Sequence, residues 1–168
     1  MQFELKVLSV DAVPRALAKA ERYRLLNEPG EAESICLDAL AVDPSNQPVL
    51  TTLLLALTDQ FSDDGRTCVT RAWQTVARLE DSYEREYYTG LIHERRAKAH
   101  LHHESPGSGP LVYDWLRQAM DCYERAEAIR PGGNDDAILR WNACVRLLRR
   151  HPNLQPATAE REEPQFLE

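Results

Sequence analysis

The chain has 168 residues, of which 43% are hydrophobic, which suits one globular domain and excludes a fully disordered chain. Its formal net charge of −7 argues against a nucleic-acid binder that works through a general basic surface. No apolar run is long enough to span a bilayer, and the first ten residues lack the cleavage site of a signal peptide. We therefore expect a cytoplasmic protein with no membrane insertion.

The cysteines are widely spaced within apolar helical patterns, and no CxxC pair is present: Cys36, Cys68, Cys122 and Cys144. This spacing predicts reduced thiols in the core rather than a disulfide framework or a zinc site. Cys122 stands between Asp121 and Tyr123 with no cation required nearby, so we expect an inert thiol rather than a nucleophile.

Residues 1–10 alternate weakly between apolar and polar side chains, which predicts an extended N-terminal arm. We expect Asp11 to cap a first helix that runs to about Asn27, with Pro14 in its first turn. Pro29 then begins a second helix that ends before Pro44, because the residue before a proline leaves the helical region. Its buried stripe has the spacing of three and four that marks an amphipathic helix: Ala32, Ile35, Cys36, Ala39 and Leu40.

Ser45 is the predicted cap of a third helix through residues 49–61, which is apolar on several sides and should be central. If its leucines are not covered by neighbouring helices, a homo-oligomer is possible through Leu53, Leu54 and Leu57. Residues 62–65 predict a turn, and a fourth helix follows from Arg66 to about Glu80.

A long fifth helix is predicted from Asp81 to Leu101, in which Gly90 permits close packing of a neighbouring helix. Residues 102–110 predict a loop and residues 111–131 a sixth helix. Asn134 or Asp135 should cap a seventh helix that ends before His151. Residues 151–168 contain three prolines and mixed charges, and predict an acidic, disordered tail.

One short pattern occurs twice in the chain. Ala32, Cys36, Ala39 and Pro44 recur as Ala119, Tyr123, Ala126 and Pro131, with twelve residues from the first alanine to the proline in both. Together with Ala16, Ala20 and Tyr23 before the first copy, this pattern resembles the tetratricopeptide repeat (TPR) family, whose repeat is an antiparallel helix pair. The resemblance implies an all-α, TPR-like α-solenoid of about three helix pairs plus a C-terminal capping helix over residues 11–150.

The resemblance also implies where a ligand would bind, since TPR proteins bind along the concave face formed by the first helix of each pair. The candidate partner-binding residues on that face are Arg24, Thr52, Leu55, Tyr88, Leu91, Arg95, Asn142 and Arg146. The carboxylate-clamp members of the family need lysines and asparagines at defined positions, where this chain has Leu17, Glu21, Thr52, Glu84 and Tyr88. The clamp is therefore absent, and a partly apolar peptide or partner helix is the expected ligand.

Two clusters of basic residues, around Arg95, Arg96 and Lys98 and around Arg146, Arg149 and Arg150, allow two interpretations. A run of charge is usually a solvated helix face. Alternatively, some of these arginines line a groove and bind an acidic peptide or a C-terminal carboxylate.

The histidines allow a metal site on residues 93–104, because His100, His103 and Glu104 share one helix face. The interpretation we favour is a solvated helix end. His93 and Glu94 begin a metalloprotease-like HExxH pattern, but Ala97 stands at the second histidine position.

The sequence contains no nucleophile elbow, P-loop or dinucleotide turn, so we expect no catalytic residue, no metal and no cofactor. The predicted function is a protein–protein interaction module, an adaptor or scaffold whose partner is another protein or peptide. The alternatives are a small acidic TPR-like chaperone for a secreted protein and, less favoured, a metal-binding protein that uses His93–Glu104.

Overall fold

The computed structural model describes residues 3–63, 65–103 and 107–157, and these ranges are helical with no β-strand. The predicted all-α class is thereby confirmed. The described ranges contain, in chain order, η1 (Val10–Ala12), α1 (Val13–Leu25), α2 (Pro29–Val42), α3 (Gln47–Asp59), α4 (Gly65–Val76), α5 (Ser82–His102), α6 (Gly109–Ala128) and α7 (Asp136–Arg150).

Most helices begin where the sequence predicts, because a proline or a capping side chain marks the first turn. A proline occupies one of the first two positions of α1, α2, α3 and α6, where its missing N–H leaves no bond unmade. The Asp81 carboxylate caps α5 by accepting the backbone N–H of Glu84 at 2.8 Å.

Two predicted caps are wrong. Asn46 rather than Ser45 caps α3, since its side-chain oxygen accepts the backbone N–H of Val49 at 3.1 Å. Asp11 lies inside the short turn η1 and does not cap α1. The cap of α3 therefore lies one residue later than predicted, and Ala12, whose side chain cannot cap, precedes α1.

Helix α4 ends at Val76, before the predicted end at Glu80. The residues that follow it form hydrogen bonds with the segment at the start of α3. The Oε1 atom of Gln47 accepts the backbone N–H of Glu80 at 2.9 Å. The guanidinium of Arg78 donates to the carbonyl oxygen of Pro44 at 2.6 Å. These long-range hydrogen bonds hold residues 77–80 outside the helix. No local pattern in the sequence predicts them.

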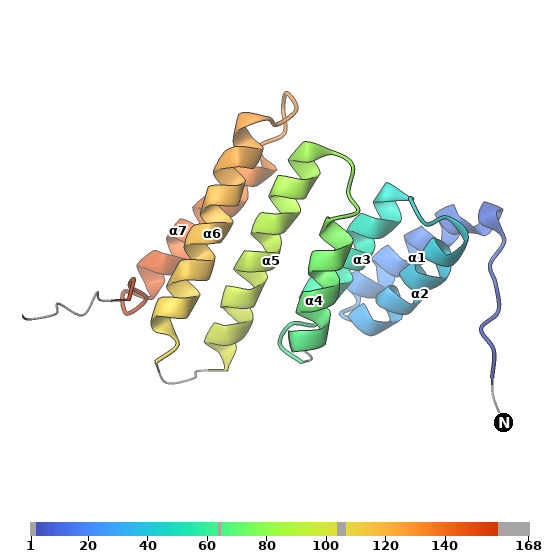
Figure 1. The fold of residues 1–168 in the computed structure, drawn as a ribbon, viewed down its shortest axis with the longest axis horizontal. Helices are drawn as coiled ribbons and strands as arrows, with labels where there is room; N and C mark the ends of the chain where they lie inside the picture. The colour runs from blue at the N-terminus through green and yellow to red at the C-terminus, as the bar shows by residue number, and fades with distance from the viewer. Residues whose placement is uncertain (1–2, 64, 104–106, 158–168) are drawn as a thin grey trace, which may run out of the picture.

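The helices follow one another across the molecule, and each packs on the next along the chain (Figure 1). Helices α1 and α3 also touch, as do α3 and α5. Figure 1 shows the N-terminal helices α1 and α2 at one end and α6 and α7 at the other. This arrangement keeps most contacts local in the sequence.

The core divides into two buried clusters. One draws on α1 to α4 and is joined by Ile92 of α5, and the other draws on α5 to α7 and on Leu154. Leu53, Leu54 and Leu57 are at most 3% exposed. Their neighbours in the same chain cover them, so the third helix gives no reason to expect a homo-oligomer.

Helices α5 and α6 approach each other closely at Gly90. A Cβ atom on this residue would lie 2.7 Å from Cε1 of Tyr123 and 3.1 Å from the carbonyl oxygen of Ala119. Tyr123 is fully buried, so its ring fills the space that a side chain at position 90 would need. The predicted role of Gly90 in close packing is confirmed.

The ends of the helical region differ from each other. Residues 3–9 form neither helix nor strand, and Phe3, Leu5 and Val7 are more than 80% exposed. At the other end the packing continues past α7, because Leu154 is buried in the second cluster. The predicted tail falls mostly on residues 158–168, which lie outside the described ranges. No helix in the described part of the chain has the length and apolar character that crossing a bilayer requires.

Candidate functional site

Two of the predicted partner-binding residues, Arg24 of α1 and Arg95 of α5, meet at Asp59 of α3. Nε of Arg24 donates to one carboxylate oxygen at 2.9 Å, and Nη1 of Arg95 donates to the other at 2.9 Å. The three side chains are 20–32% exposed. The two arginines therefore share one carboxylate, which partly neutralises their charge within the chain.

The other predicted residues on this face are distributed unevenly. Thr52 and Leu91 are buried at 5% and 3% exposure, while Leu55, Tyr88 and Asn142 are half-buried and Arg146 is exposed. Tyr88 packs edge-on against Tyr87, and burial raises its pKa above the ordinary value of 10. Asn142 and Arg146 lie on α7, at the far end of the row (Figure 1). The structure thus brings together Arg24 and Arg95 but does not gather all eight residues.

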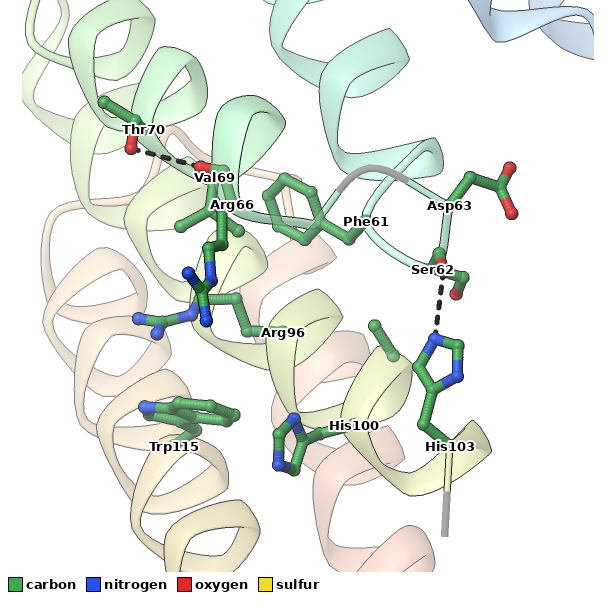
Figure 2. Close-up of a pocket in the computed structure, with 11 residues that line it drawn as sticks. Phe61, Ser62, Asp63, Arg66, Val69, Thr70, Arg96, His100, His103 and Trp115 are labelled. Carbon is green, nitrogen blue, oxygen red and sulfur yellow. Dashed lines mark hydrogen bonds between the residues drawn. The ribbon is translucent and has the colours of Figure 1, made fainter. Parts of the chain in front are cut away.

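A different region forms a hollow. The turn after α3, the start of α4, the end of α5 and the first half of α6 enclose an open pocket of about 760 Å³. We call it the Arg96 pocket (Figure 2). It is lined by Phe61, Ser62, Asp63, Arg66, Val69, Thr70, Arg96, Ala99, His100, His103 and Trp115.

Two arginines give the Arg96 pocket its charge. Figure 2 shows the side chains of Arg66 and Arg96 extending into the same space above Trp115, while the Asp63 carboxylate points away. Neither arginine forms an ion pair with any residue in the described ranges. Burial lowers the pKa of Arg96 below its ordinary value, because this guanidinium has lost part of its water without gaining a carboxylate partner in the described ranges.

Trp115 supplies the flat apolar wall of the pocket. The Cζ atom of Arg96 lies 4.2 Å from the centre of the Trp115 ring, in a cation–π contact. His100 packs edge-on against the same ring, with 5.3 Å between ring centres and 87° between planes. Stacking on a rigid ring orients the guanidinium and leaves its N–H groups available to a ligand.

The histidines do not assemble into a metal site. His100 packs on Trp115, Nε2 of His103 donates to the carbonyl oxygen of Ser62 at 2.9 Å, and His93 packs against Trp73. In the part of the chain that the structure describes, no three histidine, cysteine or acidic side chains are grouped to hold a metal ion. The predicted fourth member, Glu104, lies outside the described residues.

The four cysteines are buried thiols that form no disulfide, as predicted. Burial raises the pKa of the Cys36 and Cys144 thiols to about 12, and raises that of Cys122 as well. A thiol with a raised pKa is almost fully protonated at neutral pH and is a poor nucleophile. Cys36, Cys122 and Cys144 are therefore poor nucleophiles.

A second hollow, of about 500 Å³, lies against α1 alone and is lined by Arg15, Ala18, Lys19, Arg22, Tyr23 and Leu26. Its cations lie on a single helix face, and Lys19 approaches the Tyr23 ring at 5.9 Å. A basic stripe on one helix is common on protein surfaces, whereas the Arg96 pocket joins three helices and a turn.

Sequence reasoning found part of the Arg96 pocket. It identified the basic cluster that contains Arg96 and the alternative that its arginines bind an acidic peptide. It did not identify Arg66 or Trp115, because they come from other helices and no sequence pattern connects them with Arg96. The pairing depends on how α4 and α6 are placed on either side of α5.

Comparison of this chain with models of protein families, with characterised proteins and with solved structures gives no match. The resemblance to TPR proteins accordingly stays a prediction from the residues that carry it.

Proposed function

We propose that this chain is a protein-interaction module of the TPR-like kind, and that it binds an acidic segment of another protein in the Arg96 pocket. The observation that carries the proposal is the convergence of Arg66 and Arg96, without an acidic partner in the described ranges, over the ring of Trp115.

The charge of the pocket favours an acidic ligand. The chain as a whole carries −7, whereas this pocket holds two guanidinium groups that form no ion pair within the described ranges. A guanidinium can bind a carboxylate through two parallel hydrogen bonds, which fixes orientation as well as affinity. Because Arg96 is already partly desolvated, the additional cost of binding an anion there is reduced.

The walls of the pocket favour a ligand with an apolar side chain beside its acidic groups. Three apolar side chains line the pocket: Phe61, which is buried, Val69, which is half-buried, and Trp115. Aromatic and arginine side chains are the residues that most often dominate binding energy at protein interfaces. A free inorganic anion would leave this apolar surface in water.

The face with Arg24 and Arg95 is the less favoured binding site, because both arginines already bind Asp59. A chaperone for a secreted protein would use the same pocket as an adaptor and would differ only in the protein that it binds. Co-expression with a candidate secreted protein tests it, since a chaperone keeps that protein soluble.

The experiment is capture of cellular proteins on the immobilised full chain, compared between wild type and the double variant Arg66→Ala/Arg96→Ala. The matched control is Arg117→Ala/Arg149→Ala, which removes two exposed arginines outside the pocket. We expect at least one partner to be retained by the control and reduced at least tenfold with the pocket variant, about 1.4 kcal/mol or more. Equal capture by all three proteins would remove the proposal.

A further inference from the structure

The sequence after the last described residue, Ala157, has the properties of a ligand for the Arg96 pocket. Residues 158–168 contain four glutamates, Glu160, Glu162, Glu163 and Glu168, and one arginine, which gives a formal charge of −3. The apolar pair Phe166 and Leu167 lies among them. The segment thus combines the acidic groups and the apolar side chain for which the pocket is built.

The described end of the chain passes close to the start of the helix that carries Trp115. Leu154 is 5% exposed, and its Cδ2 atom lies 3.9 Å from where a Cβ would stand on Gly109, at the start of α6. Trp115 follows Gly109 on the same helix, about 9 Å along the axis at 1.5 Å per residue. Leu154 and Trp115, a wall of the pocket, therefore both lie at the first half of α6.

The length of the segment is sufficient. The path half-way round a helix of about 10–12 Å diameter and about 9 Å along it measures roughly 20 Å. Ala157 is three residues from Leu154, so it lies at most about 10 Å further from Trp115, and the nine residues from Ala157 to Phe166 span up to about 30 Å when extended. Phe166 can therefore reach Trp115 without disturbing the helices.

We infer that residues 158–168 bind in the Arg96 pocket of the same chain, with their glutamates on Arg66 and Arg96 and Phe166 against Trp115. This inference rests on the proposed function, because it names a ligand of the same site. A tethered segment is present at a high effective concentration, so a partner must displace it. The segment would then set the affinity that a partner needs.

The test uses the full chain and the indole N–H signals of its tryptophans, Trp73, Trp115 and Trp141, in ¹H–¹⁵N NMR spectra. The tail variant Glu160→Gln/Glu162→Gln/Glu163→Gln removes three negative charges. The matched control is Glu4→Gln/Glu31→Gln/Glu124→Gln, which neutralises three exposed glutamates outside the pocket. Trp115→Phe assigns the signal that reports on the pocket.

We expect the Trp115 signal to move in the tail variant and to move in the same direction when salt in the wild-type sample is raised to about 0.5 M, which screens charges beyond a few Å. Trp73 and Trp141 should stay in place, and the control variant should leave all three signals unchanged. An unmoved Trp115 signal overturns the inference. A movement that depends on protein concentration also overturns it, because the segment would then bind a second copy.

Capture of cellular proteins by the same variants separates this inference from the proposed function. If the segment competes with a partner, the tail variant should capture several-fold more of it than wild type does. Suppose that a partner depends on Arg66 and Arg96, that the Trp115 signal does not move, and that wild type and tail variant capture the partner equally. This result overturns the inference and supports the proposed function. A moving Trp115 signal without any such partner supports the inference and removes the proposed function.

Discussion

The phenol oxygen of Tyr123 lies 2.7 Å from Oε2 of Glu94, and both side chains are fully buried between α5 and α6. Arg140 of α7 and Lys98 also bind the carboxylate. Burial alone would raise the pKa of Glu94, but Arg140, Lys98 and Tyr123 together hold it below its ordinary 4.5. One carboxylate therefore joins three successive helices.

Glu94→Gln should destabilise the protein by about 3 kcal/mol or more, because it leaves the positive charges of Arg140 and Lys98 without their buried counter-ion. The matched variant is Glu86→Gln, whose partner Arg125 is 57% exposed, and it should cost no more than about 1 kcal/mol. Urea unfolding followed by circular dichroism measures both. Similar losses for the two variants would contradict a structural role for the buried cluster.

Gly90→Ala should destabilise the protein by about 1–3 kcal/mol, even though alanine favours helix by about 1 kcal/mol over glycine. The new methyl group would lie 2.7 Å from the buried Tyr123 ring, which its bond to Glu94 holds in place. Gly30→Ala is the control, since its Cβ would meet only Gln60 Oε1 at 3.9 Å. The control should be neutral or stabilising, and a stable Gly90→Ala protein would show that the two helices can move apart freely.

His93→Phe should remove a loss of stability that wild type shows in mild acid. Burial first, then the charges of Arg96 and Arg125, lower the pKa of His93 from 6.5 to about 4. The unfolded chain thus binds more protons than the folded one between these values, so wild-type stability falls as pH drops from 6.5 toward 4. The slope from this group approaches about 1.4 kcal/mol per pH unit. Chemical unfolding at several pH values should show the stability difference between the two proteins growing as pH falls from 6.5 toward 4 and staying constant above pH 6.5. Parallel curves below pH 6.5 would contradict the prediction.

Asp59→Asn should lower stability by about 1 kcal/mol, because Arg24 and Arg95 lose their shared carboxylate and are left close together. The effect should diminish in high salt, since the pairs are partly exposed. Asp121→Asn removes one surface pair with Arg117, whose side chains are about half exposed, and should have no measurable effect. Thermal unfolding at low and high salt distinguishes the two variants.

The sequence by itself determined the elements of this protein. Proline positions, the cap at Asp81 and the spacing of small and apolar residues predict the seven helices of the described ranges, because these signals act within one or two turns of a single helix. The absent Cβ of Gly90 likewise predicts a close approach of helices. It does not say that Tyr123 is the side chain that fills the space.

The tertiary structure decided which side chains meet. Arg24 and Arg95 were predicted on one binding face. Because α1, α3 and α5 pack together, both arginines instead donate hydrogen bonds to the Asp59 carboxylate. Arg66, Arg96 and Trp115 come from three different helices, and only the placement of those helices turns them into a pocket. Helical periodicity fixes which residues share a face of one helix, whereas the rotation and separation of neighbouring helices depend on all the side chains packed between them.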